Sequence, residues 1–220
     1  MSRRSVVALS VVLAIVVALP LPASNMGLAL RMQLDSTSQP LHFISLPYLY
    51  TPATAEALCQ DLGGSGCVSE ILRWDDATST FVEYSCGSGA GDFALEEGMG
   101  YGVRVVLYQS IDALVVGIHD DTFEFDFAPG AGANLHFISL PYHLALPDAG
   151  GQEDVVDAED LCIQVGPELF SVMRWNEATG RFEAYLCGSK FATAFELEQG
   201  VAYGLVNVDG GTIQWQPTHY

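Results

Sequence analysis

Hydrophobic positions along most of the chain form short runs or alternate with polar ones, which is typical of β-strands rather than of long helices. Residues 41–46 form a short apolar run that is stopped by Pro47, and they predict a buried strand. Residues 122–127 alternate strictly, which predicts a strand that turns its Phe side chains to a core and its acids to solvent. Residues 54–62 begin with a Thr suited to an N-cap and continue with good helix formers, so they predict a short helix.

The chain contains this pattern twice, and the self-similarity decides the domain organisation. The octapeptide Leu-His-Phe-Ile-Ser-Leu-Pro-Tyr at 41–48 recurs unchanged at 135–142. Further matches in the same order are 55–59 with 158–162, 73–78 with 174–179, 81–88 with 182–189 and 93–102 with 195–204. Two copies are too few for a solenoid. We therefore expect a mostly β fold of two tandem antiparallel β modules, each with one short helix.

Each copy also contains a predicted hairpin. In the first copy, strands at 69–74 and 80–85 flank a turn whose Asp75 can bond to its own backbone. In the second copy, Asn176 takes the same place and Gly180 suits a left-handed position. Two more strands are expected in each copy, at 102–108 and 113–118 and at 204–208 and 212–216.

The start of the chain reads as an export signal. Arg3 and Arg4 precede a run that is almost wholly apolar and that ends at Leu19, which is shorter than the roughly 20 residues of a membrane-spanning helix. Cleavage is expected after Ala23, with Ala29 as the alternative site; an uncleaved N-terminal anchor and a twin-arginine signal are further alternatives. The expected organisation is then a signal peptide at 1–24, a short linker at 25–38, a first module at 39–128 and a second module at 129–220.

Composition and net charge limit the classes of partner that the chain is expected to bind. The 220 residues are 50 % hydrophobic, which is enough for a packed core. Eight basic residues stand against 27 acidic ones, a formal net charge of −19. Such a surface repels nucleic acid and anionic lipid, so neither is an expected partner, and no stable membrane insertion is expected after signal cleavage.

The cysteines predict an oxidising compartment. Cys59 and Cys86 match Cys162 and Cys187 in the repeat, so one disulfide per module, Cys59–Cys86 and Cys162–Cys187, is expected. Cys67 has no counterpart, and it is either a free thiol or an alternative partner of Cys59 or Cys86.

No catalytic constellation is recognisable, and no catalytic residue, metal ligand or cofactor is predicted. His42 and His136 lie in matched apolar strands and are expected to be hydrogen-bonded structural residues, with a metal or catalytic role as the alternative. Ser45 and Ser139 lack a nucleophile-elbow context and are expected to pack or bond to backbone.

An acidic cluster is a further candidate for a metal site. The residues are His119, Asp120, Asp121, Glu124 and Asp126. A solvated strand face is the expected explanation, and a calcium site with oxygen ligands is the alternative.

Recurring aromatic residues have two interpretations. Trp74 and Trp175 match each other and are expected in the core, with a ligand platform as the alternative. Tyr48, Tyr50 and Tyr142 follow the first strand of each module and are candidates for an exposed patch. These five residues form the candidate ligand surface.

Three motifs resemble repeats of secreted and cell-surface bacterial proteins, in which the opening often reads Trp-Asn-Leu-Ile-Ser-Leu-Pro. They are the opening strand at 41–47, the Trp-Asp-x-x-Thr-x-x-Phe-x-x-Tyr hairpin at 74–84 and the ending Gly-Tyr-Gly-Val at 100–103. The resemblance implies an extracellular β-rich accessory module, and it brings no catalytic residues with it.

The expected role is therefore a secreted, non-catalytic tandem-repeat module with a structural, adhesive or scaffolding function, located outside the cell, at its surface or in the periplasm. Its partner would be an extracellular protein or a glycan. The alternatives are a carbohydrate- or ligand-binding module, assisted by calcium or not, and a hydrolase that uses scattered carboxylates.

Overall fold

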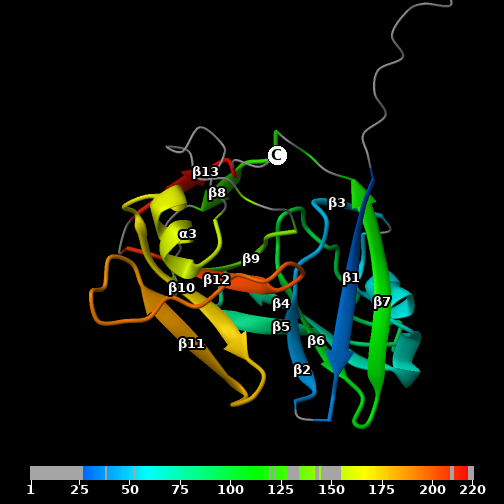
Figure 1. Cartoon of the computed structure of the whole chain (residues 1–220). Coiled ribbons are helices and arrows are strands. Elements are labelled where there is room, and N and C mark those ends of the chain that lie inside the picture. Colours follow the sequence, from blue (N-terminus) through cyan, green and yellow to red (C-terminus); the bar gives the residue numbers. More distant parts are fainter. Residues whose placement is uncertain are drawn as a thin grey trace, which may run out of the picture.

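A computed structural model describes residues 27–37, 39–51, 53–118, 120, 122–127, 134–141, 144, 155–208 and 211–217. The fold is mostly β with antiparallel pairing, as predicted (Figure 1). The first half contains β1 (Gly27–Asp35), β2 (Leu41–Ile44), β3 (Leu49–Tyr50), α2 (Ala55–Asp61), a 3-10 turn (Gly64–Gly66), β4 (Val68–Asp75), β5 (Thr80–Ser85), β6 (Tyr101–Val105) and β7 (Ser110–Ile118). The second half contains β8 (Phe125–Phe127), β9 (Leu135–Ser139), α3 (Ala158–Val165), β10 (Leu169–Asn176), β11 (Arg181–Leu186), β12 (Ala202–Asn207) and β13 (Ile213–Trp215).

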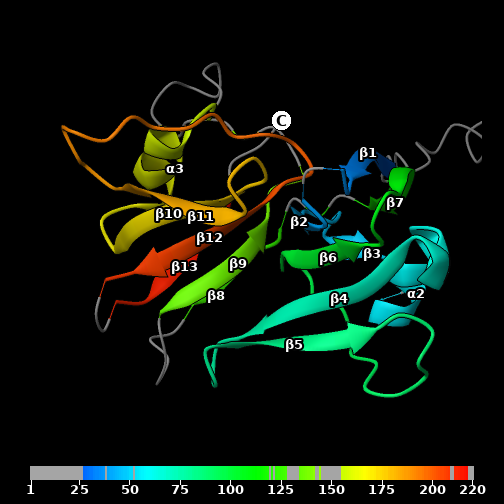
Figure 2. The same cartoon turned by 90° about the horizontal axis from the view of Figure 1, so that it is seen from below.

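Each half is built on a four-stranded sheet with the same strand order, β2-β6-β4-β5 in the first and β9-β12-β10-β11 in the second. Figure 2 shows the two sheets beside each other, seen from below. Both predicted hairpins are present, β4–β5 and β10–β11, and in both the first strand has a register shift near its start, where it pairs with β6 or β12. The duplicated sequence has therefore folded into a duplicated sheet.

The prediction that residues 25–38 form a linker is wrong for most of this segment. Residues 27–35 form β1, which pairs with β7 over its full length, from Gly27 opposite Ile118 to Asp35 opposite Ser110. The reason is in the sequence: Leu30, Met32 and Leu34 alternate with polar residues and bury one face against the core of the first half.

The expected boundary between the modules at 128/129 is also corrected. β8 pairs with β13, and its Phe125 and Phe127 belong to the core of the second half. The strand before each repeated octapeptide thus pairs with the last strand of its own half, β1 with β7 and β8 with β13. The alternation of 122–127 is present as predicted, with Phe125 and Phe127 buried and Asp126 exposed, although the strand begins only at Phe125.

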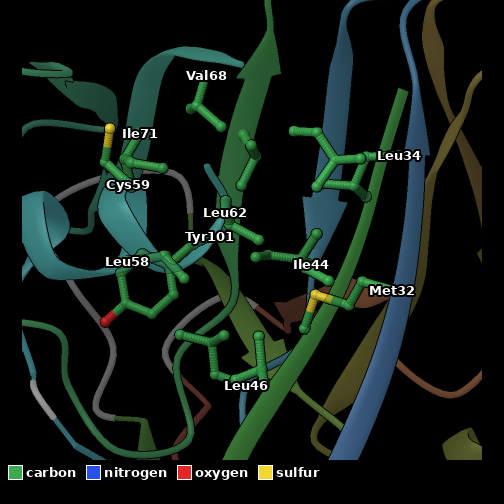
Figure 3. Packing of buried hydrophobic residues seen from close by; sticks show 14 of the residues in the cluster. Met32, Leu34, Ile44, Leu46, Leu58, Cys59, Leu62, Val68, Ile71 and Tyr101 are labelled. Carbon is green, nitrogen blue, oxygen red and sulfur yellow. The ribbon is translucent and has the colours of Figure 1, made fainter. Parts of the chain in front are cut away.

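Both predicted helices are present and short. In α2 the Thr54 side chain accepts the N–H of Ala57 at 3.2 Å, which is the N-cap bond expected from the sequence. In α3 Asp157 plays the same part for the N–H groups of its first turn. Leu58 of α2 and Leu62, the residue that follows the helix, belong with Met32 of β1 to the core of the first half (Figure 3).

The buried apolar residues fall into three clusters. One lies within the first half and another within the second half. The third lies between the halves and is centred on Phe43, Phe137 and Ala202, with Trp74 and Trp175 packed partly buried against it. Over the described residues, no helix has both the length and the apolar character needed to span a bilayer.

Candidate functional site

The interface between the halves brings identical residues of the repeat together. The Phe43 ring stacks on the ring of Phe137, its counterpart, with centroids 5.1 Å apart and planes at 19°. Phe81 and Phe182 flank the pair from the two hairpins, at 5.7 and 5.0 Å from Phe43. Because each half presents the same residues to the other, the contact has the reciprocal character of an isologous interface.

Two histidine–carboxylate pairs cross the same interface. Nδ1 of His42 lies 2.5 Å from Glu177 in the β10–β11 turn, and Nδ1 of His136 lies 2.7 Å from Asp76 in the β4–β5 turn. Both histidines are buried, whereas both carboxylates reach solvent. The hydrogen bonds predicted for the histidines are present, and each imidazole contacts the hairpin turn of the other half.

The backbone repeats this reciprocity. The N–H of Ser45 donates to the carbonyl of Gly200 at 2.8 Å, and the N–H of Ser139 donates to the carbonyl of Gly98 at 2.7 Å. The Ser139 hydroxyl accepts the N–H of Leu46 at 2.9 Å and donates to a backbone carbonyl. These contacts explain why the octapeptide is identical in the two copies, because it builds the joint between them.

Most residues of the candidate ligand surface are buried or partly buried. Trp74 and Trp175 pack between the halves, as the core prediction has it. Tyr48 and Tyr50 are only 3 % and 7 % exposed, so the prediction that they form an exposed patch is wrong. Tyr48 lies in the core of the second half and Tyr50 donates its hydroxyl to Asp61 at 2.5 Å. Tyr142 lies outside the described residues.

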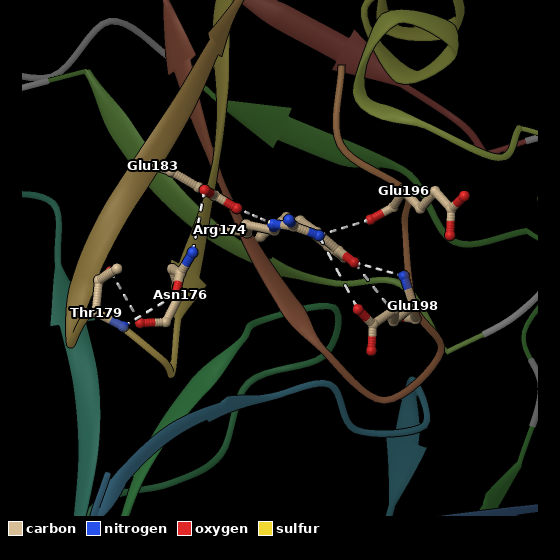
Figure 4. A network of polar contacts seen from close by, with 7 residues as sticks. Arg174, Asn176, Thr179, Glu183, Glu196 and Glu198 are labelled. Atoms are coloured by element: carbon tan, nitrogen blue, oxygen red, sulfur yellow. Dashed lines mark hydrogen bonds and ion pairs between the residues drawn. The ribbon is translucent and has the colours of Figure 1, made fainter. Parts of the chain in front are cut away.

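Arg174 in β10 belongs to a polar network within the second half (Figure 4). Its guanidinium donates to Glu183 and to the carbonyl of Glu196, lies 4.0 Å from the Glu198 carboxylate and covers the Phe195 ring at 4.5 Å. The hydrogen bond from Arg174 holds the pKa of Glu183 below its usual value.

The matching arginine of the first half has a similar environment, although Val82 stands opposite it where the second half has Glu183. Arg73 pairs with Glu96 at 2.6 Å and covers Phe93 at 5.1 Å. Arg73 and Arg174 are matched residues of the repeat, and each has its charge compensated by acids of its own half. Each arginine therefore joins a hairpin strand to acids of its own half.

The second half contains a cavity of about 590 Å³. Its described lining residues are Leu140, Leu144, Val155, Val156, Asp157, Glu196, Leu197, Glu198, Gln199 and Tyr203. Aliphatic side chains and carboxylates therefore face the same space. Such a site favours a small ligand with an apolar body and a cationic or hydroxyl-bearing group.

Tyr203 lines the cavity and also contacts Glu198 of the polar network around Arg174. Its hydroxyl accepts the N–H of Glu198 at 2.6 Å, and burial raises its pKa to about 12, so the phenol stays protonated. Asp157 is occupied in part by capping α3, with the N–H groups of Glu159 and Asp160 at 2.9 and 3.0 Å. Glu196 and Glu198 are thus the carboxylates best placed to meet a ligand.

The predicted disulfides are both present. Cys59 bonds to Cys86 and Cys162 bonds to Cys187, and in each half this ties the helix to the end of the hairpin. Cys67 is a free thiol, which resolves the alternative left open for it. It lies partly buried against the core of the first half.

The acidic cluster is only partly described, because His119 and Asp121 lie outside the described residues. Asp120 accepts the N–H and hydroxyl of Thr122 at 2.8 and 2.7 Å, while Glu124 and Asp126 are exposed. Among the described residues, no group of three His, Cys, Asp or Glu side chains is placed to hold a metal.

Two features were missed in the sequence. The cavity depends on residues from 140, 155 and 197 meeting in space, and no local signal marks it. The solvent side of β7 was missed although a signal exists, because Leu114 and Val116 occupy the exposed positions of an alternating strand and are 64 % and 55 % exposed.

Comparison with known proteins adds no relative: no protein-family model, no curated protein and no solved structure matches this chain. Its role therefore has to be inferred from its own interface, cavity and surface.

Proposed function

We propose that the chain is a secreted, non-catalytic tandem-repeat module with a structural, adhesive or scaffolding role at the cell exterior. The observation that carries this proposal is the location of the residues shared by the two halves. Phe43 and Phe137 face each other in the interface, and His42 and His136 join each half to the opposite hairpin turn. Residues shared for the sake of a reaction or a ligand belong at an accessible site, whereas these stabilise the fold.

The cysteines and the charge support an extracellular setting. One disulfide in each half suits an oxidising compartment. The motifs of 41–47, 74–84 and 100–103 resemble repeats of secreted and cell-surface bacterial proteins, which agrees with this setting. A net charge of −19 favours a protein or glycan partner over nucleic acid.

The test is a glycan array probed with the purified mature chain, once with Ca²⁺ and once with a chelator. The structural role predicts no strong signals under either condition. Several strong signals would replace it with carbohydrate binding, and signals that need Ca²⁺ would identify a calcium-assisted binding module. Release of sugar from a bound glycan would establish a hydrolase.

The cavity supports a second candidate, a binding module for small cationic ligands. Its volume of about 590 Å³ lies within the range of ligand sites, and Glu196 and Glu198 line it beside aliphatic residues. Thermal-shift measurements with a series of alkylamines test this candidate. Stabilisation that disappears in Glu196→Gln/Glu198→Gln, but persists in Glu83→Gln on the exposed side of β5, would support it; no shift with any amine would exclude it.

A further inference from the structure

The solvent side of the three-stranded sheet β1-β7-β3 carries an apolar strip. Leu114 and Val116 of β7 and Leu49 of β3 are 64 %, 55 % and 40 % exposed. Register places Ala29 of β1 opposite Val116, and Leu49 opposite Ile118, which is 42 % exposed. Cross-strand partners share a face, so these five residues form one continuous surface, called here the apolar strip. Figure 1 shows β7 at the side of the first half that is remote from the second half.

The second half provides an internal control for this surface. Its corresponding strand pair, β8–β13, has Asp126 opposite Gln214, and Glu124 and Thr212 are exposed beside them. The fold thus forms the same strand pair with a fully polar outer face. The apolar residues of the strip are not needed for folding, and an exposed apolar face that folding does not require indicates an interaction surface.

The charges around the strip identify the partner. Arg31, opposite Leu114, forms a two-bonded ion pair with Asp112, at 2.8 and 2.5 Å, so the nearest charges compensate each other. Two copies of a chain with net charge −19 repel each other, and a face whose charges are paired is where that repulsion is small. The strip is aliphatic and offers no side-chain hydrogen bonds, which disfavours a glycan.

We propose that the apolar strip is a self-association surface, through which two copies of the chain stack the outer faces of their β1-β7-β3 sheets. Flat sheet faces pack in this way at about 10 Å separation. A two-fold arrangement brings the same patch of each copy together. This proposal goes beyond the structural role argued above, and a monomeric chain would leave that role intact.

The size of the strip sets the strength expected. Nine residues of β7 extend about 30 Å and three strands are roughly 10 Å wide, so two stacked faces bury on the order of 600 Å². Stable complexes bury roughly 1,200 Å² or more. The dimer is therefore weak and reversible, with a dissociation constant on the order of 100 μM or above.

Sedimentation velocity over a concentration series from about 10 μM to 1 mM, at low and high NaCl, tests the proposal. The expected result is a weight-average mass that rises toward the dimer with concentration. The rise is larger at high salt, because salt screens the repulsion between acidic chains but not an apolar contact. A mass that stays monomeric at the highest concentration and salt would overturn the proposal.

Variants locate the surface. Leu114→Thr/Val116→Thr places a β-branched, β-favouring side chain at both positions, so the strand is expected to be kept. Each change occurs twice in a two-fold interface, so the dissociation constant is expected to rise at least about tenfold. The matched control is Phe170→Ser/Leu186→Ser, which removes exposed apolar residues of the second half and introduces the serines found at 69 and 85 of the first. Equal weakening by both variants, or by neither, would refute the assignment.

A measurement on the unmodified chain covers the case in which the double variant does not fold. Methyl NMR of a dilution series is expected to show concentration-dependent shifts at Leu114 and Val116 and none at Leu186. Shifts that avoid the strip would contradict the proposal. Flotation of a strictly monomeric chain with phosphatidylcholine vesicles, lost in Leu114→Thr/Val116→Thr, would assign the strip to a lipid surface instead.

Discussion

The Glu177 carboxylate lies 2.5 Å from Nδ1 of His42, a histidine that is 2 % exposed and belongs to the other half of the chain. His136 and Asp76 form the same pair in the opposite direction. Nε2 of each ring is buried and has no hydrogen-bond partner among the described residues. The carboxylate is therefore the polar contact that each imidazole depends on, and the pairing fits a ring whose Nδ1 carries the proton.

Removing either carboxylate should weaken the joint between the halves. Glu177→Ala leaves the His42 ring buried without its hydrogen bond, and we expect a loss of about 1–3 kcal/mol in the free energy of unfolding. Asp76→Ala should cost a similar amount through His136. Urea unfolding at pH 7 measures both. Glu83→Ala, an exposed acid on β5, is the control and should stay within about 0.5 kcal/mol of the unmodified chain. Equal stability of Glu177→Ala and Glu83→Ala would contradict the inferred role.

The stacked pair of Phe43 and Phe137 predicts that the two halves unfold together. Phe43→Ala opens a cavity between the sheets and should cost about 3–5 kcal/mol. Phe137→Ala should have a similar effect, and the double variant should lose less than the sum, because both remove the same contact. Circular dichroism and tryptophan fluorescence, with Trp74, Trp175 and Trp215 as probes, should report one coincident transition. Two separate transitions in the unmodified chain would show that each half is stable without the other.

The elements predicted correctly are those with local signals. The N-cap at Thr54 marks α2, and the left-handed position predicted for Gly180 is present with φ 62°. The matched cysteines gave the correct disulfides because the repeat restricts the pairing to equivalent positions.

The error for Tyr48 arises because the burial of its ring depends on the other half. Tyr48 follows a strand and comes directly after Pro47, a context typical of a surface turn. Its ring nevertheless packs on Phe123 of the other half, with the ring centroids 4.4 Å apart. The error for residues 25–38 has a different cause, because the alternation within 27–35 is a local signal for a strand that the expected linker did not take into account. The meeting of Phe43 with Phe137 could not be predicted, because spacing along one chain does not specify a two-fold contact between copies.

The disulfides should contribute substantially to stability. The spans of 27 and 25 residues correspond to about 3.5 kcal/mol each in the chain-entropy description. Cys59→Ala/Cys86→Ala and Cys162→Ala/Cys187→Ala should each lower the urea midpoint by a corresponding amount. Cys67→Ser is the control, since Cys67 forms no disulfide, and peptide mass mapping should find both bridges intact in it. A shuffled bridge that includes Cys67 in the unmodified chain would contradict the assignment.

Acid should destabilise the chain through Glu56. Its pKa is held below the usual value because its carboxylate accepts hydrogen bonds from Tyr84, Gln60 and Gly87, at 2.5, 2.7 and 3.1 Å. A carboxyl with a lowered pKa in the folded state contributes stability above its unfolded pKa of about 4.3, and this contribution is lost as the pH falls through the folded value.

The pH dependence of unfolding tests the contribution of the Glu56 carboxylate to stability. The free energy of unfolding should decline as the pH falls below about 4, and Glu56→Gln should flatten part of that decline while lowering stability at pH 7. Glu159→Gln is the matched control, because Glu159 occupies the same place in α3 and its carboxylate accepts no such hydrogen bonds from the described residues. A decline changed equally by both substitutions would contradict the role of Glu56.

The pairing of β1 distinguishes the two cleavage sites expected for the proposed export signal. β1 begins at Gly27, opposite Ile118, and its first residues pair with the last residues of β7. Cleavage after Ala23 keeps all of β1, whereas cleavage after Ala29 would remove three of its residues and leave the end of β7 without that neighbour. N-terminal sequencing of the exported chain should therefore begin at Ser24. A chain made to begin at Leu30 should unfold at a lower temperature than one that begins at Ser24, since it lacks three pairs of that ladder. An exported protein that begins at Leu30 would show that this end of β1 is dispensable.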